Sequence, residues 1–352
     1  MPSKLKTIVK KSLYTAGYYH LYRRLAAPPD KRLLVLMYHD LGLHRARPNN
    51  RSLDDDSPSP FQFENHLRTL AKRCRVVSLK NAIASIRSGD ALDADSVAIT
   101  FDDGYESFYS VAYPLLRKYD LPATVFLVTD WVDREVLTWW HRLRQVLGGA
   151  DLSRIKKEHL ETAAGPGAPA LPPRGKSHRV ARNQFNRDLE TMFRNMPDGI
   201  RAGRLDALEK MLFPHDGINP VSVRMLGWDQ IREMANYKIE FESHTQTHVN
   251  MRFAGPTSVE REIRESKTEI EARIQREVTG FAYPYGQDLA SYVGFEQYLR
   301  SQGFVYACNA CSGSNSARSN LFSLYRAALP LTESPAVIHR EIILRSIRSN
   351  ED

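Results

Sequence analysis

Two pairs of polar residues in this chain carry the side chains from which catalytic metal sites are built. Asp102 and Asp103 come directly after one short apolar run, and His244 and His248 follow a second run more than a hundred residues later. Two histidines four positions apart share one face of a helical turn and can bind one cation, while a carboxylate from another strand end supplies a third ligand. The spacing predicts a metal site and leaves one aspartate free to act as a base.

Both apolar runs have the composition of buried strands. Residues 97–101 are β-branched and aromatic and are followed by Gly104, and residues 239–243 repeat that layout. Taken alone, the two aspartates are typical of a surface turn, and the two histidines are typical of a helix surface. Parallel strands of a barrel deliver their carboxyl ends to one rim, so the two motifs together favour a single metal site.

We expect a divalent cation, most typically zinc, to bind Asp103, His244 and His248. Three protein ligands leave open positions for water and for a substrate carbonyl, as in catalytic zinc sites. Asp102 would then deprotonate the attacking water. Attack on an acyl carbon creates an oxyanion that the metal and a backbone N–H can stabilise, and a leaving amine requires a general acid.

Strand-like and helix-like segments alternate along the chain, which predicts an α/β fold with a mostly parallel sheet curled into a barrel. The expected strands cover residues 33–38, 97–101, 123–128, 239–243, 281–283, 304–308 and 322–329. The clearest helix runs from about residue 259 to residue 277, with Thr257 and Glu260 as a capping box and Gly280 as its stop.

A long connection over about residues 140–225 separates the third strand from the fourth. Its Gly- and Pro-rich stretch, residues 165–173, is a loop by composition, and its flanks have helical periodicity. We interpret the connection as a cap beside the site, because loops at the C-terminal face of a barrel frame active sites. A disordered spacer is the alternative. We therefore expect an arm over residues 1–30, a main domain over 31–335 that contains the insertion, and a C-terminal helix or tail over 336–352.

Positive charge is concentrated at the start of the chain. The formal net charge is +8, and the first 32 residues hold eight Lys or Arg against one acid. The remainder is nearly neutral, which argues against a nucleic-acid-binding protein. The arm has helical spacing of apolar residues, which predicts an amphipathic helix that contacts an anionic membrane surface or packs on its own domain. Lysines interrupt any signal-peptide core, so we expect a cytoplasmic protein or one peripheral to the inner membrane.

Five motifs give the chain a resemblance to the polysaccharide deacetylases, the family of the NodB homology domain. They are VLMYH at 35–39, TFDDGY at 100–105, PATVF at 122–126, SHTQTH at 243–248 and FAYPYG at 281–286. The resemblance extends from residue 33 to about residue 329 and implies a distorted (β/α)7 barrel. It implies the same metal ligands, with Asp102 as the base and the Tyr285 backbone N–H as the oxyanion donor. The family removes acetyl groups, usually from N-acetylglucosamine polymers, so the resemblance implies deacetylation of amino sugars in a polysaccharide or glycan precursor.

The chain departs from the family pattern at two places. Many members have an arginine that orients the base where this chain has Ala282, and Arg326 is either its replacement or a surface arginine. The C-terminal Leu-x-x-His that supplies the general acid in many members is not evident. Members that open with Tyr-His resemble the biofilm poly-N-acetylglucosamine deacetylases and use the histidine of that opening, which favours His39 over His339 as the acid. The alternative for His39 is a core histidine at a strand end.

Two other functions fit the same residues. A carbohydrate O-acetyl esterase would share every catalytic residue and differ only in the recognition of its acceptor. A non-catalytic glycan-binding protein is disfavoured, because a binder needs no base beside a metal. In either case Trp139, Trp140 and Tyr105 are candidates for a platform on which a sugar stacks, with burial in the core as the alternative.

Overall fold

The computed structural model describes residues 32–42, 57–88, 96–152, 155–172, 179–214, 217–286 and 294–347. The predicted basic arm over residues 1–30 lies outside these ranges, so its membrane contact stays a prediction. Within the described ranges, no helix has both the length and the apolar character that a membrane span requires.

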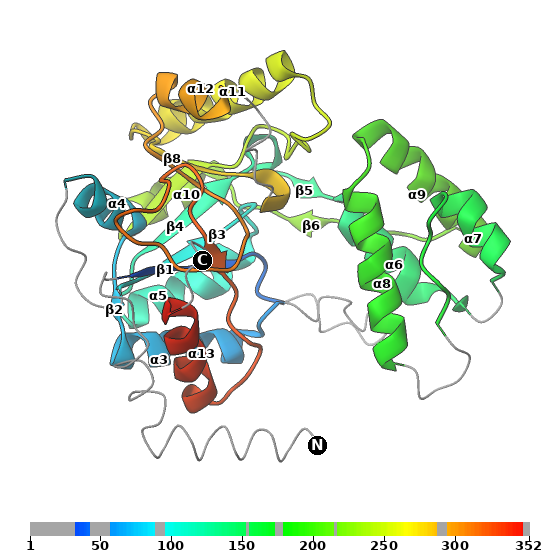
Figure 1. Cartoon of the computed structure of the whole chain (residues 1–352), viewed down its shortest axis with the longest axis horizontal. Coiled ribbons are helices and arrows are strands. Elements are labelled where there is room, and N and C mark those ends of the chain that lie inside the picture. The colour runs from blue at the N-terminus through cyan, green and yellow to red at the C-terminus, as the bar shows by residue number, and fades with distance from the viewer. Residues whose placement is uncertain are drawn as a thin grey trace.

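The described residues form an eight-stranded parallel sheet that curls into a nearly closed barrel (Figure 1). Seven strands follow one another around it, and the eighth, β2 (Arg75–Val76), pairs with β3 outside this order. In spatial order they are β10 (Arg326–Ala327), β1 (Leu33–Tyr38), β3 (Ser96–Phe101), β4 (Ala123–Leu127), β7 (Ile239–Ser243), β8 (Gly280–Ala282) and β9 (Tyr306–Cys308). A parallel bridge between Cys308 and Leu324 links β9 toward β10. This arrangement confirms the expected distorted (β/α)7 barrel.

The last strand is much shorter than predicted. Of the expected strand over residues 322–329, only Arg326–Ala327 pairs with β1. The preceding segment turns, and Leu324 exchanges backbone hydrogen bonds with Ala307 and Asn309 instead of continuing an extended strand along β1. This turn directs Arg326 into the barrel.

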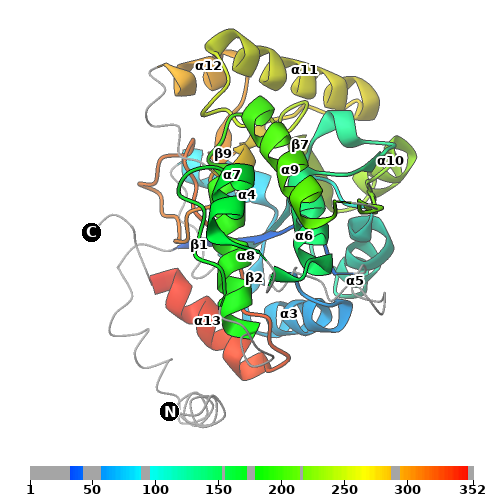
Figure 2. The same ribbon diagram turned by 90° about the vertical axis from the view of Figure 1, so that its right-hand side faces the viewer.

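Helices surround the barrel because its strands are buried on both faces, so that β3 and β4 have no exposed residue. The covering helices are α3 (Pro60–Arg73), α4 (Leu79–Ser88), α5 (Tyr113–Lys118), α10 (Trp228–Ala235), α11 (Pro256–Ile274), α12 (Phe295–Ser301) and α13 (Pro335–Ile347). Figure 2 shows α11 and α12 on one side of the barrel and α3 and α13 on the opposite side.

The predicted ends of α11 are wrong. The helix begins earlier, with Pro256 in its first turn and Gly255 as an N-cap that makes no side-chain hydrogen bond, so Thr257 and Glu260 form no capping box. Proline is suited to the first turn because its φ is already helical and its missing N–H needs no partner there. The helix ends at Ile274, and Gly280 instead lies in β8, where a side chain would collide with the ring of Tyr306.

The insertion is a helical body beside the barrel. It contains α6 (Trp139–Gly149), α7 (Lys157–Ala164), α8 (Arg179–Arg194) and α9 (Asp198–Leu212). The antiparallel strands β5 (Glu135–Val136) and β6 (Val223–Arg224) flank it, and Figure 1 shows its helices standing to one side of the barrel. The four helices have a hydrophobic core of their own, which includes Leu143, Phe185, Phe193 and Leu205. Its described residues are therefore not a structureless spacer.

Candidate metal centre and active site

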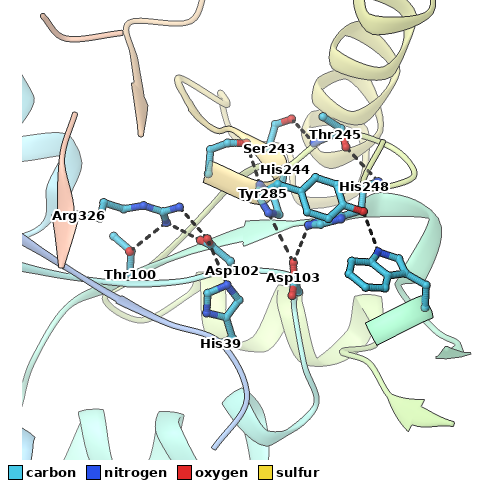
Figure 3. Close-up of polar contacts among 12 residues, drawn as sticks. His39, Thr100, Asp102, Asp103, Ser243, His244, Thr245, His248, Tyr285 and Arg326 are labelled. Carbon is cyan, nitrogen blue, oxygen red and sulfur yellow. Dashed lines mark hydrogen bonds and ion pairs between the residues drawn. The ribbon is translucent and has the colours of Figure 1, made fainter. Parts of the chain in front are cut away.

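Asp103, His244 and His248 meet in the interior at the C-terminal ends of β3 and β7 (Figure 3). The Asp103 Oδ1 atom lies 3.5 Å from the Nε2 atom of each histidine, and the three possible ligand atoms lie within 4.8 Å of one another. A tetrahedral zinc ion with ligand bonds of about 2.0–2.2 Å separates its ligand atoms by about 3.3–3.6 Å. The spacing therefore fits a cation bound between the three side chains.

The protonation chemistry of the three residues also fits a cation. Among the described residues, the Asp103 Oδ1 atom that faces both histidines is buried without a hydrogen-bond partner. Burial and the neighbouring Asp102 carboxylate raise the pKa of Asp103 to about 8. Burial lowers the pKa of His244 to about 4 and that of His248 well below its usual range. A buried carboxylate beside two neutral imidazoles lacks a compensating positive charge, and a divalent cation would supply it.

The two histidines do not share a helical turn, so that part of the prediction is wrong. His244 follows β7 directly, and the chain then forms a loop in which Thr245 and His248 have φ values of 68° and 61°. The Thr245 hydroxyl accepts the backbone N–H of His248 at 3.1 Å. Glu262 of α11 accepts the backbone N–H and the hydroxyl of Thr247 at 2.7 and 2.8 Å. This loop, rather than helical periodicity, brings both rings to Asp103.

His244 is oriented by a hydrogen bond behind the site. Its Nδ1 atom lies 2.8 Å from the backbone oxygen of Ala282. A carbonyl can only accept, so Nδ1 carries the proton and Nε2 is left as a free lone pair toward Asp103. The departure from the family pattern at Ala282 therefore leaves the backbone contact to His244 in place.

His248 is oriented by packing instead. Its ring stacks on Trp131 with centroids 5.3 Å apart and an interplanar angle of 25°. Trp140 and Tyr285 approach it at 5.2 and 4.7 Å. No sequence motif indicated Trp131, which lies in the short 3-10 helix Thr129–Trp131 that follows β4.

Asp102 forms a buried ion pair with Arg326. Two guanidinium nitrogens donate to its two carboxylate oxygens at 2.6 and 2.7 Å, and the residues are 3% and 1% exposed. Arg326 also donates to the backbone oxygen of Asn309 at 2.8 Å and lies 3.4 Å from the Thr100 hydroxyl. Burial favours the neutral acid, but the guanidinium outweighs it and holds the pKa of Asp102 below its usual range. Arg326 is therefore not a surface arginine.

The two candidate general acids lie in different environments. His39 is 45% exposed, and its Nε2 atom is 3.8 Å from the Asp102 carboxylate. It lines the same cavity as Asp103, His244 and His248, so it is not a core histidine. His339 lies in α13, is 4% exposed, and is not among the residues that line this cavity. The geometry places only His39 within reach of the site.

A cavity of about 610 Å³ opens onto the site. Trp139, Trp140 and Tyr105 all line it, but Tyr105 is 3% exposed and packs in a small cluster with Val223 and Met225. The two tryptophans are half-buried and remain the better platform. The insertion also contributes charged lining residues that no sequence motif indicated, namely Arg144, Glu190 and Arg194.

A buried carboxylate–imidazole triad at the rim of a parallel barrel, with a second carboxylate paired to arginine, defines a hydrolase-like centre. Comparison with known proteins agrees with this geometry. The sequence model for polysaccharide deacetylase matches residues 89–167 and 172–307, which is more than half of the chain. The chain belongs to the polysaccharide deacetylase family.

Curated relatives share only a segment with this chain. A poly-beta-1,6-N-acetyl-D-glucosamine N-deacetylase of Staphylococcus aureus is 34% identical over 88 residues, which are 25% of this chain and 30% of that protein. The Escherichia coli (strain K12) protein of the same name is 33% identical over 85 residues, which are 20% of this chain and 13% of that protein. The match therefore spans less than a third of the length of these relatives.

Solved structures share the fold over most of the chain. The Streptococcus pyogenes deacetylase PplD in complex with acetate has a TM-score of 0.57 and 18% identity, and the match covers 91% of this chain and 100% of that one. IcaB from Ammonifex degensii has a TM-score of 0.52 and 17% identity, with 90% and 97% covered. At this identity the similarity shows the barrel fold alone.

Proposed function

We propose that this protein is a metal-dependent N-deacetylase that removes acetyl groups from amino sugars in a glycan. The observation that carries the proposal is the meeting, in one cavity, of the Asp103–His244–His248 triad with the Asp102–Arg326 ion pair and the partly exposed His39. Membership of the polysaccharide deacetylase family supports the same chemistry.

The triad would hold the cation, and the cation, most typically zinc, would polarise the acetyl carbonyl and the attacking water. Asp102 accepts the proton of that water, and Arg326 keeps its carboxylate charged and fixed in one orientation. His39 donates a proton to the leaving amine from the open side of the cavity. The Tyr285 backbone N–H stabilises the oxyanion.

The names of the relatives suggest the first substrate to test. Both relatives are named for poly-β-1,6-N-acetyl-D-glucosamine. We infer that this chain acts on β-1,6-linked N-acetylglucosamine or on a glycan precursor that contains N-acetylated sugar. The half-buried Trp139 and Trp140 would offer a face for stacking.

Product analysis tests the reaction. Purified protein loaded with zinc is incubated with β-1,6-linked N-acetylglucosamine oligomers, chitin oligomers and O-acetylated sugars, and released acetate and new amines are measured. We expect equal amounts of acetate and amine, and no product after chelation. Acetate without new amine would instead identify an O-acetyl esterase, and no acetate from any substrate would contradict both activities.

A matched pair of variants tests the metal ligand. Asp103→Asn should lose both bound metal and turnover. Asp120→Asn is the control, because Asp120 also has a positive φ, 55° against 73° for Asp103, but is exposed and pairs with Lys238 away from the site. Full metal content in Asp103→Asn would show that the assigned site is wrong.

A further inference from the structure

Tyr285 has an unusual backbone conformation at the edge of the site. Its φ and ψ are 62° and 5°, in the left-handed region that side chains other than glycine rarely adopt. The next residue, Gly286, has a φ of 63° and packs so closely on Ala310 that a side chain there would collide with it. A turn of this kind persists only when its surroundings hold it.

The hydroxyl of Tyr285 is held by two residues of the insertion. The indole N–H of Trp139, at the start of α6, donates to it at 3.1 Å. The guanidinium of Arg201, in α9, donates to it at 3.4 Å. The same guanidinium lies 4.8 Å from the ring centroid of Trp139 and 5.6 Å from that of Tyr285. The three side chains therefore form one packed cluster.

Arg201 is itself fixed in place. It is 4% exposed, donates to the backbone oxygens of Phe193 and Met196 at 2.9 and 2.8 Å, and pairs with Asp198 at 2.8 Å. An arginine with this many short contacts presents its remaining N–H in a defined direction. The hydroxyl of Tyr285 is thus bound to a rigid part of the insertion and is already engaged before substrate arrives.

The opposite side of Tyr285 faces the reacting centre. Its ring contacts that of His248 with centroids 4.7 Å apart, and Figure 3 shows the two side by side next to Asp103. A shift of the Tyr285 ring would therefore move the turn that carries its backbone N–H. The contacts form a continuous path from α6 and α9 to the catalytic rim.

We propose that Trp139 and Arg201 are positioning residues, which hold Tyr285 by its hydroxyl and so fix its backbone N–H toward the developing oxyanion. The inference rests on the proposed function, because it assigns the oxyanion donor to Tyr285. It makes the insertion part of the catalytic apparatus rather than only a wall of the substrate cavity.

The size of the effect distinguishes positioning from direct catalysis. Tyr285→Phe removes the hydroxyl and keeps both the ring and the backbone N–H. We expect kcat to fall about 10-fold, the loss that corresponds to one neutral hydrogen bond. Removal of an oxyanion donor itself costs about 100- to 1000-fold. KM should change less than about 2-fold, because the hydroxyl is already bound by Trp139 and Arg201.

A double-variant cycle provides the decisive test. Trp139→Phe removes the indole N–H that donates this hydrogen bond, and Tyr285→Phe removes the hydroxyl that accepts it. If this bond acts through position, the double variant should have the same kcat as Tyr285→Phe, about 10-fold below wild type, and not the product of the two single losses. Trp139→Phe alone should lose no more than Tyr285→Phe, because Arg201 still donates to the hydroxyl in that variant. Arg201→Ala is unsuitable alone, since it also removes the hydrogen bonds to Phe193 and Met196 and the ion pair with Asp198. In the two single variants and the double variant, the melting temperature should stay within about 4 °C of wild type. Their zinc content should equal that of wild type.

Tyr109→Phe is the matched control, because the Tyr109 hydroxyl donates to Glu233 at 2.8 Å on an exposed surface away from the cavity. It should keep wild-type kcat. Wild-type kcat in Tyr285→Phe, multiplicative losses in the double variant, or a rise in KM alone would each overturn the inference while leaving the deacetylase activity intact. A wild-type protein that releases no acetate would instead remove the proposed function, and the inference with it.

Discussion

The Asp102–Arg326 ion pair allows a sharp stability prediction. Both side chains are almost fully buried, at 3% and 1% exposure, and two short hydrogen bonds join them. Arg326→Met leaves the Asp102 carboxylate in the interior without the positively charged guanidinium that pairs with it. Breaking a buried pair costs about 3–5 kcal/mol, whereas loss of an exposed pair costs about 0–1 kcal/mol. Because domains are stable by about 5–15 kcal/mol, we expect Arg326→Met to fold with a much reduced free energy of unfolding.

Urea unfolding in the presence of a chelator measures this loss without a contribution from bound metal. We would compare wild type, Arg326→Met, Asp102→Asn and the double variant. Since asparagine carries no charge to leave unpaired, the double variant should be more stable than the sum of the single losses predicts, by about 1–3 kcal/mol. Arg224→Met is the control, because Arg224 pairs with Glu135 at 3.8 Å while both are more than 60% exposed, at 72% and 64%.

Two results would refute this reasoning. One is a loss in Arg326→Met as small as that in Arg224→Met, which would mean that water reaches Asp102. The other is strict additivity in the double variant, which would show that Arg326 stabilises the barrel through its contacts with Asn309 and Thr100 rather than through Asp102.

Three further predictions concern single side chains. Asp102→Asn should retain zinc but lose about 10²- to 10⁴-fold in kcat, because an amide cannot accept the proton of water; near-wild-type turnover would remove Asp102 from the mechanism. His39→Ala should reduce turnover of amide substrates far more than that of activated esters, since an amine leaving group needs the proton more; if His339→Ala shows this selective defect instead, the assigned acid is wrong. Burial lowers the pKa of His66 to about 4 from 6.5. The unfolded chain therefore binds a proton that the folded protein excludes, and the free energy of unfolding should fall by about 3 kcal/mol as the pH drops from 6.5 to 4. Because His244 and His248 also have lowered pKa values, His66→Gln should still lose stability across this range, but by about 3 kcal/mol less than wild type in urea unfolding. Equal pH dependence in both proteins would contradict the prediction.

The sequence alone predicted the parts of the site that depend on local pattern. The strands β1 and β7 have the predicted boundaries, because a short β-branched and aromatic run in a parallel barrel is buried on both faces and ends where polar residues begin. The residue types of Asp103, His244 and His248 indicated a metal site, and the strand ends placed them at one rim. These features follow from side-chain chemistry and from strand periodicity.

The directions in which these side chains point were not predictable in this way. Thr245, His248 and Tyr285 all have positive φ, although none is a glycine. Such conformations cost local free energy and persist because distant residues hold them. Glu262 of α11 fixes the histidine loop, and no local pattern around residues 244–248 indicates it. The predicted helical turn failed for this reason.

The choice between alternative residues for one role also depended on the tertiary structure. Sequence left Arg326 as a candidate or a surface residue, and it left His39 and His339 both open. Barrel closure decided the first, because β10 pairs with β1 and brings Arg326 across the interior to a carboxylate more than 200 positions earlier in the chain. The packing of α13 buries His339 away from the cavity, which leaves His39 as the candidate beside the site. Residue types set the chemistry that this site can perform, whereas the long-range packing of strands and insertion selected which residues are close enough to perform it.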